Sequence, residues 1–335
     1  MTDSTCQTKQ CASSSRCCYN RQMQTWTIQK LLNWITDYFT DKGIDAPRLS
    51  AELLLSHVLS LKRIELYTQF DTPVEQQQLR RLHALTKRAG QNEPVAHLTG
   101  KTEFYSLELN ITPDCLIPRP ETELLVERAI EFLRRRVAER PVMQSALQEG
   151  QACDASGAPT QFVCDLCTGS GCIAVAIAAN FGQARIIATD ICDSALEVAA
   201  ANAEKHRLKN RITLLQGDLF DPLIRQPDTP EFDLIVCNPP YVSAPEFEAL
   251  DKNVKDYEPK IALLAGADGL DIYRPIIEKA DRFLKSDGAL MLEIGCAQGP
   301  AVKDLIEQTG AFAEIRIEKD INSNDRILTA TKTLS

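Results

Sequence analysis

Four residues that follow an apolar segment, Asn238, Pro239, Pro240 and Tyr241, have the types and order needed to hold a planar amino group. The Asn238 side-chain oxygen and the Pro239 carbonyl oxygen can accept the two hydrogens of an NH2 group, and the Tyr241 ring offers a face for packing. Two successive prolines fix their own φ angles and hold Asn238 extended, so the loop is stiff. The pattern predicts a loop that orients an amino nitrogen towards an electrophile, with the rate gained from orientation and electrostatic preorganisation.

A second candidate site is the loop at residues 167–171, which lies between an apolar segment and an alanine-rich one and consists of Cys167, Thr168, Gly169, Ser170 and Gly171. Its two glycines let the backbone come close to a ligand, and the start of the following helix offers free N–H groups. Asp190 ends the next apolar segment, where an acidic residue accepts hydrogen bonds from ribose hydroxyls. Together they predict a nucleoside-containing cofactor, although so short a glycine pattern also occurs as simple packing at a strand-to-helix turn.

The same stretch contains a C-x-x-C pair, Cys164 and Cys167, which raises the alternatives of a metal site or a redox pair. The chain has no second C-x-x-C, and its four histidines lie far from the loop in sequence, so we expect no metal. A redox pair normally opens a helix, whereas Cys164 lies inside an apolar segment. The twelve cysteines are scattered through a long chain, which favours free thiols in a reducing cytoplasm over a disulfide framework.

The elements that would position these residues follow from periodicity. Residues 1–25 are polar and aperiodic and are expected to be a disordered tail, whereas residues 26–92 have the apolar spacing of a small helical bundle, with Ser50 as the cap of its second helix. Residues 93–117 alternate as in a β-hairpin linker. Residues 118–335 alternate between strand and helix patterns, with a loop insertion expected at 140–160, and predict an α/β domain with a mainly parallel sheet.

Charge limits the class of partner. Residues 94–335 carry 25 Lys and Arg against 37 Asp and Glu, which weighs against tight binding to a phosphate backbone. No apolar run approaches the roughly 18 residues that a membrane helix needs. We therefore expect a cytoplasmic protein that acts on a protein or small molecule, without direct binding to nucleic acid or membranes.

The motifs in order resemble a known family. The Asn-Pro-Pro-Tyr loop, with DLCTGSG and an acidic strand end before it, is similar to class I S-adenosylmethionine-dependent methyltransferases that act on amino nitrogens. Four further blocks, LIPRPETELLVE, EPKIALLAGADGLDIYRPII, LEIGCAQG and the late DRI, resemble the HemK/PrmC family of peptide chain release factor N(5)-glutamine methyltransferases. The resemblance covers roughly residues 26–335.

This resemblance implies a helical N-terminal domain that docks the substrate, a hairpin linker and a Rossmann-like domain of seven strands, the last antiparallel. It implies methyl transfer from S-adenosylmethionine to the glutamine amide of the Gly-Gly-Gln motif in class I release factors by a monomeric enzyme. Residues 167–171 would line the methionine end and sugar of the cofactor, Asp190 would bind the ribose, and Asp218 and Leu219 would flank the adenine. Residues 238–241 would hold the glutamine, with Asn238 also near the cofactor.

Two positions depart from the family pattern: Cys167 stands where the first loop glycine is usual, and Leu219 where an aromatic residue is common. If position 167 needs a positive φ, its Cβ costs on the order of 1 kcal/mol. Arg119 and Glu121 fit a helix start and could also touch substrate or close the cofactor site, whereas Glu258 is expected to be structural.

Three other functions remain open from the residues. A DNA adenine N6-methyltransferase shares the Asn-Pro-Pro-Tyr loop, but the acidic domain and the lack of a DNA-reading module argue against it. A sister enzyme methylates a glutamine of a large-subunit ribosomal protein; it typically has a different segment after the "PR", so IPRPETE favours the release-factor branch. A protein that binds the cofactor without catalysis is the third alternative, and the intact Asn-Pro-Pro-Tyr loop argues against it.

Overall fold

The computed structural model describes residues 25–139, 160–226 and 228–333. The chain forms two compact units that divide between His83 and Ala84, within one helix, and each is described by itself. The tail expected at 1–25 and the insertion expected at 140–160 lie outside the described residues, apart from Thr25 and Thr160. The domain bounds expected from the sequence stay a prediction.

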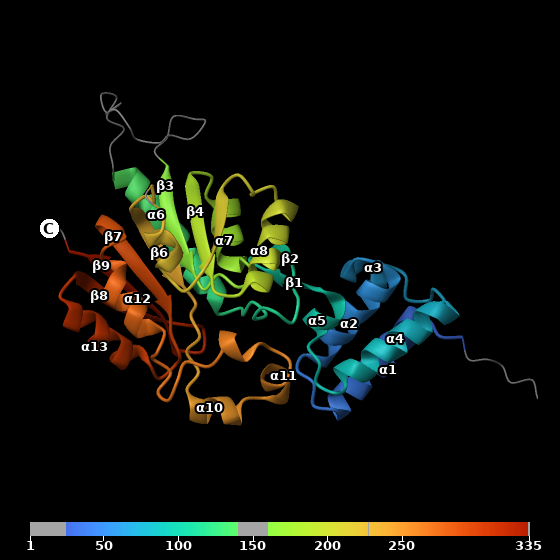
Figure 1. The fold of residues 1–335 in the computed structure, drawn as a ribbon. Helices are drawn as coiled ribbons and strands as arrows, with labels where there is room; N and C mark the ends of the chain where they lie inside the picture. Colours follow the sequence, from blue (N-terminus) through green and yellow to red (C-terminus); the bar gives the residue numbers. More distant parts are fainter. Residues whose placement is uncertain (1–24, 140–159, 227, 334–335) are drawn as a thin grey trace, which may run out of the picture. The chain divides into compact units, whose positions relative to one another are not determined.

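The N-terminal unit is helical, as its periodicity predicts (Figure 1). It contains α1 (Ile28–Asp41), α2 (Pro47–Leu59), α3 (Arg63–Thr68) and the first part of α4 (Gln76–Ala89). The expected cap at Ser50 is wrong, because α2 already begins at Pro47. Proline suits a first helical position, since its missing N–H would have no partner in the helix there.

The second unit begins with the end of α4, α5 (Val95–Thr99) and the predicted hairpin of β1 (Lys101–Phe104) and β2 (Leu107–Asn110). Tyr105 and Ser106 turn the hairpin with φ angles of 51° and 60°. The Asn202 side chain receives the Asn110 N–H at 2.7 Å and donates to the Asn110 carbonyl at 3.1 Å. The hairpin is thus fastened to the helix that carries Asn202, α8 (Asp193–Lys205).

A seven-stranded sheet forms the centre of this unit, in the order β5-β4-β3-β6-β7-β9-β8 (Figure 1). Its strands are β3 (Gln161–Leu166), β4 (Ala184–Asp190), β5 (Ile212–Gln216), β6 (Phe232–Cys237), β7 (Leu284–Glu293), β8 (Phe312–Lys319) and β9 (Asp325–Lys332). The strands from β3 to β7 pair in parallel, and β9 is antiparallel to both of its neighbours. The predicted Rossmann-like sheet with an antiparallel last strand is confirmed.

Helices cover both faces of the sheet (Figure 1). One apolar core joins one face to α6 (Thr122–Glu139), α7 (Cys172–Asn180) and α8. The other core joins the opposite face to α9 (Asp221–Ile224), α12 (Tyr273–Ala280) and α13 (Gly299–Thr309). Short helices α10 (Ala244–Ala249), α11 (Lys252–Lys255) and η1 (Lys260–Ala262) lie between β6 and α12 in the chain. Because β3 and β6 are buried on both faces, their sequences are almost continuously apolar.

A buried ion cluster ties α6 to the sheet. The fully buried Asp233 carboxylate lies 3.2 Å from the Arg136 guanidinium and 2.6 Å from the Lys285 ammonium. It also accepts the Phe162 N–H at 2.9 Å. The cluster therefore holds α6, β3 and β7 around β6.

Asp233→Ala should lower the free energy of unfolding by about 3 to 5 kcal/mol, because two cations and an N–H would lose their common buried acceptor. Urea unfolding checks this value. Glu307→Ala removes the exposed ion pair to Lys303 and serves as the control, with an expected loss below about 1 kcal/mol. Equal losses for the two variants would contradict the importance of the buried cluster.

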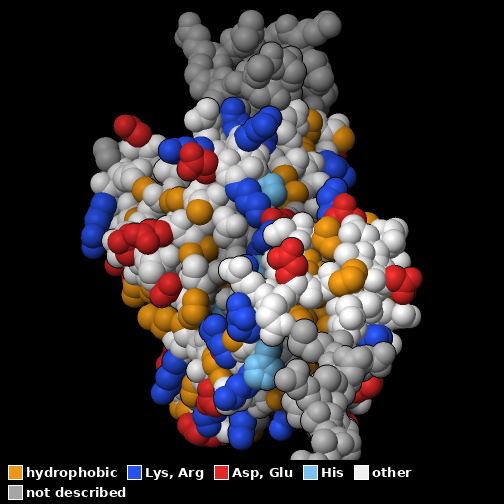
Figure 2. All heavy atoms as spheres, turned by 90° about the vertical axis from the view of Figure 1, so that its right-hand side faces the viewer, with side chains coloured by type: hydrophobic (Ala, Val, Ile, Leu, Met, Phe, Trp, Pro, Cys, Tyr) orange, Lys and Arg blue, Asp and Glu red, His pale blue; other side chains and the backbone are white. Residues whose placement is uncertain are grey.

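No helix among the described residues is long and apolar enough to cross a membrane. On the face that Figure 2 shows, Lys and Arg side chains are interspersed with Asp and Glu.

Candidate active site

The glycine-containing loop follows β3 directly. Cys167, Gly169 and Gly171 all have a positive φ, at 55°, 53° and 76°. A Cβ on Gly171 would lie 2.9 Å from the Ala199 Cβ, so helix packing requires glycine there. A Cβ on Gly169 would meet no atom within 4 Å, so that side of the loop is open. The loop therefore has one tightly packed glycine and one that leaves its backbone accessible.

Asp190, at the end of β4, holds this loop. One carboxylate oxygen accepts the Gly169 N–H at 2.8 Å and the other accepts the Cys192 N–H at 2.9 Å. Burial raises the pKa of the carboxyl, and the backbone N–H donors oppose that rise. Because each oxygen can accept more than one hydrogen bond, Asp190 can bind hydroxyls of a ligand while it keeps the loop in place.

Sequence reasoning did not identify Asp165 as part of this site. Its carboxylate accepts the Thr168 hydroxyl at 2.6 Å and the Ala174 N–H at 3.2 Å, and so links the loop to α7. Burial raises the pKa of Asp165 to about 7. Its Oδ1 atom is buried without a hydrogen-bond partner among the described residues. An acidic residue inside an otherwise apolar strand was the available signal.

The segment after β5 carries the remaining candidates for cofactor binding. Asp218 is exposed, whereas Leu219 is only 9% exposed and packs into the apolar core. Leu219 has a φ of 46°, and its carbonyl accepts the Thr189 hydroxyl at 3.0 Å. The neighbouring Gly217 could not carry a Cβ, which would lie 2.5 Å from Pro222. The segment is therefore held in a defined shape with Asp218 on its surface.

The Asn-Pro-Pro-Tyr loop leaves β6, whose residues are all buried. Asn238 donates its side-chain NH2 to the Thr122 hydroxyl oxygen at 3.1 Å. Tyr241 donates its hydroxyl to a Glu293 oxygen at 3.4 Å, and its carbonyl accepts the Gln298 amide at 2.9 Å. Both ends of the loop are thus fixed by side chains from α6, the end of β7 and the residue before α13.

Strand register brings these parts together. Leu166, Cys237 and Leu292 lie side by side on adjacent parallel strands. The next residues along the three strands are Cys167, Asn238 and Glu293. Leu166 also pairs with Thr189, the residue before Asp190. The glycine-containing loop, Asp190 and the Asn-Pro-Pro-Tyr loop therefore occupy one edge of the sheet, where ligands bind in open α/β folds.

Sequence reasoning also did not identify Thr122 and Glu293, each of which is 1% exposed. A Glu293 oxygen accepts the Thr122 hydroxyl at 2.7 Å. Burial raises the pKa of the Glu293 carboxyl to about 7, against the opposing effects of the Thr122 hydrogen bond and the nearby Arg326 charge. An acidic residue at the end of the apolar strand β7 was the signal in the sequence.

Comparison with known proteins identifies the family. Residues 30–100 match the model of the PrmC N-terminal domain, and residues 160–325 match that of a methyltransferase domain. The release factor glutamine methyltransferase of Rhodopirellula baltica is 41% identical to this chain, over 92% of the chain and 97% of the relative. Those of Geobacter sulfurreducens and Moorella thermoacetica are each 37% identical over 91% of the chain, covering 96% and 98% of the relative.

The chain belongs to the release factor glutamine methyltransferase family. The family predicted from the motifs is therefore confirmed, and the second unit of the protein contains its methyltransferase domain.

In this methyltransferase, Arg119 forms an ion pair with Glu258, which lies 139 positions later in the chain. The Arg119 guanidinium lies 2.6 Å from one oxygen of Glu258, and the other oxygen accepts the Ile117 N–H at 3.0 Å. The Glu258 side chain is 1% exposed. The pair joins the segment before α6 to the segment before η1.

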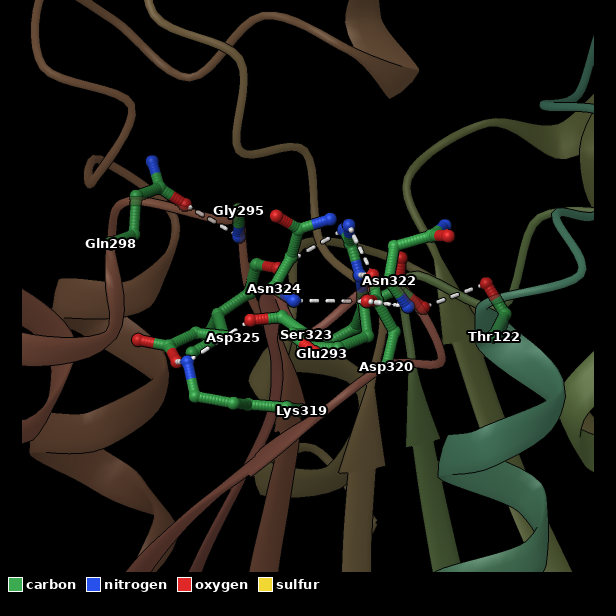
Figure 3. Close-up of polar contacts among 12 residues, drawn as sticks. Thr122, Glu293, Gly295, Gln298, Lys319, Asp320, Asn322, Ser323, Asn324 and Asp325 are labelled. Atoms are coloured by element: carbon green, nitrogen blue, oxygen red, sulfur yellow. Dashed lines mark hydrogen bonds and ion pairs between the residues drawn. The ribbon is translucent and has the colours of Figure 1, made fainter.

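The late Asp-Arg-Ile block begins just after the turn that Figure 3 labels at Asp320, Asn322 and Asn324, and it contributes a cation, Arg326. Asp320, in the turn between β8 and β9, accepts the Arg326 guanidinium at 3.2 Å and the N–H groups of Asn322 and Asn324. Arg326 also donates to the Ile294 carbonyl at 3.3 Å. Its charge favours the ionised form of Glu293, so the turn contributes to the electrostatics of the site.

Proposed function

We propose that this protein transfers the methyl group of S-adenosylmethionine to the side-chain amide of the glutamine in the Gly-Gly-Gln motif of class I release factors. The products are N(5)-methylglutamine, S-adenosylhomocysteine and a proton, which leaves the nitrogen after the methyl transfer. The observation that carries the proposal is the adjacency of the glycine-containing loop and the Asn-Pro-Pro-Tyr loop, which leave paired parallel strands at the same level. The relatives that share most of the chain are named release factor glutamine methyltransferases, which supports this substrate over DNA adenine or a ribosomal protein.

The residues proposed to hold S-adenosylmethionine fit its chemistry. The open backbone at Gly169 leaves space beside the loop, and Asp190 has acceptors for ribose hydroxyls. In our proposal, residues 167–171 line the methionine end and sugar, Asp218 and Leu219 flank the adenine, and Asn238 lies near both ligands. Because Leu219 has no aromatic ring, its contribution is van der Waals contact rather than stacking. When bound, S-adenosylmethionine supplies a methyl group on a positively charged sulfur, which is the electrophile.

Residues 238–241 are proposed to bind and orient the glutamine. An amide nitrogen is a poor nucleophile because its lone pair is delocalised into the carbonyl group. The Asn238 Oδ1 atom and the Pro239 carbonyl can accept the two amide hydrogens and draw them out of the amide plane, which localises the lone pair on the nitrogen and turns it towards the electrophile. Pro240 stiffens the loop, and the Tyr241 ring packs against the side chain. Rate enhancement then comes from orientation and preorganised acceptors.

The proposal also covers the binding partner, the oligomeric state and the location of the protein in the cell. We propose that the helical N-terminal domain, expected at 26–92, docks the release factor, and that the enzyme is a monomer. We also propose that it works in the cytoplasm without direct contact to nucleic acid. The excess of acidic residues in 94–335 supports a protein substrate.

Incubation with methyl-labelled S-adenosylmethionine tests the function. The acceptors are a class I release factor, its Gly-Gly-Gln variant with alanine for glutamine, a large-subunit ribosomal protein fraction and duplex DNA. We expect label on the unmodified release factor alone, at the glutamine of the motif. Label on the alanine variant, or only on DNA or ribosomal protein, would overturn the proposal.

Cys167→Gly tests the departure from the family pattern. Cys167 has a φ of 55°, where a Cβ costs about 1 kcal/mol, so the free loop is biased away from this conformation. Glycine removes that penalty, and we expect S-adenosylmethionine to bind up to about fivefold more tightly. Isothermal titration calorimetry measures the change, with the exposed Cys296→Ala as control. Weaker binding by the glycine variant would contradict this account.

A further inference from the structure

We propose that Glu293, acting through the Thr122 hydroxyl, is a positioning residue that determines which end of the Asn238 amide faces the substrate. The inference rests on the proposed function, because it concerns the acceptor that holds the glutamine amide. Nothing in the Asn-Pro-Pro-Tyr loop itself determines this choice. An asparagine side chain has an oxygen and an NH2 group of nearly equal size, and a half-turn about its last bond exchanges them.

The geometry is a row of three buried or partly buried side chains, of which Figure 3 labels two, Thr122 and Glu293. Thr122, the first residue of α6, lies between Glu293 at the end of β7 and Asn238 after β6. Its oxygen is 2.7 Å from Glu293 Oε2 and 3.1 Å from Asn238 Nδ2. None of the described residues donates a hydrogen bond to Asn238 Oδ1.

The direction of the hydrogen bonds follows from the carboxylate. An ionised carboxylate can only accept, so the Thr122 hydroxyl must donate its single proton to Glu293. The Thr122 oxygen is then left as an acceptor, and Asn238 must turn its NH2 group towards it. The Asn238 Oδ1 atom therefore faces away from Thr122 and is available to accept an amide hydrogen of the glutamine.

The same carboxylate acts on the other end of the loop. Its Oε1 atom accepts the Tyr241 hydroxyl at 3.4 Å. Two donors thus converge on Glu293, and both favour its ionised form. The charged and titratable groups that face Glu293 from the surrounding elements are Arg326 of β9, Tyr241, Tyr273 of α12, Glu121 before α6 and Cys172 of α7.

Glu293→Gln is the sharpest test because it keeps the size of the side chain and removes the charge that fixes the direction of these hydrogen bonds. A glutamine at this position can turn its NH2 group to the Thr122 oxygen, and the hydroxyl then donates to Asn238 and draws its Oδ1 atom inwards. The Asn238 NH2 group would then meet the glutamine NH2 of the substrate. We expect kcat to fall on the order of 100-fold, with the affinity for S-adenosylmethionine unchanged.

Two variants of Thr122 accompany it. Thr122→Val keeps the shape but removes the hydroxyl, and kcat should fall about tenfold or more, whereas Thr122→Ser keeps the hydroxyl and should stay within about threefold of the wild type. Adding Asn238→Ala to Glu293→Gln should give little further loss, because both changes remove the same interaction.

In the wild type, kcat should rise between about pH 6 and 8 as Glu293 ionises, and this rise should be absent in Glu293→Gln.

Retention of near-normal kcat by both Glu293→Gln and Thr122→Val would overturn the inference, as would full additivity with Asn238→Ala. If Glu293→Gln fails to fold, Thr122→Val and Thr122→Ser decide. If the wild type does not methylate release factors, the proposed function fails and the inference is judged on the free protein. There, the nitrogen-15 NMR signal of the Asn238 side-chain NH2, assigned by its loss in Asn238→Ala, should shift in Thr122→Val and stay in place in Thr122→Ser. An unchanged signal in Thr122→Val would overturn it.

Discussion

Asn238→Ala should lower the turnover of release factor by about 100-fold to 1,000-fold, while the affinity for S-adenosylmethionine changes by less than about threefold. The loss should be this large because the variant removes the acceptor proposed to orient the glutamine NH2, whereas Asp190 and the glycine-containing loop stay in place. Single-turnover methylation measures the chemical step, and calorimetry measures cofactor binding.

Asn180→Ala is the matched control, because Asn180 is an exposed residue at the end of α7 and should leave both quantities unchanged. If Asn238→Ala kept near-normal turnover, the orienting role of Asn238 would be disproved. A large loss of cofactor affinity in Asn238→Ala would instead assign the residue chiefly to the cofactor.

Asp190→Ala should weaken the binding of S-adenosylmethionine by about 100-fold or more. The variant removes the proposed ribose acceptors and also leaves the N–H groups of Gly169 and Cys192 without their carboxylate. Hydrogen bonds to charged groups contribute about 1.5 to 3 kcal/mol each, and a 100-fold change corresponds to about 2.7 kcal/mol. Calorimetric titration with S-adenosylmethionine gives the dissociation constants.

Asp190→Asn refines this test, since one acceptor is kept as an amide oxygen while an NH2 donor replaces the other, so an intermediate loss is expected. The exposed Asp304→Ala on α13 is the control for the removal of a negative charge. Unchanged affinity in Asp190→Ala would refute the assignment of Asp190 to the ribose.

The sequence alone was sufficient for features that depend on neighbouring residues. Alternation of strand and helix patterns predicts the mainly parallel sheet, and the glycines predict a loop that ends where α7 begins, at Cys172. The positive φ considered for Cys167 is observed at 55°. Asp190 and Asn238 were placed at strand ends because one ends an apolar segment and the other follows one. Parallel strands bring such ends to one edge of a sheet.

Tertiary structure decided what those residues contact. Thr122 and Glu293 are 171 positions apart, and only the packing of α6 against the sheet brings the hydroxyl of one to the carboxylate of the other. The Arg119–Glu258 contact likewise depends on the packing of segments that are distant in the sequence. Periodicity and spacing describe which face of an element is apolar, whereas a hydrogen bond between distant segments depends on their relative placement to a few tenths of an ångström. The sequence thus indicated which loops form the candidate site, and the packing of α6 decided which group the Asn238 side chain contacts.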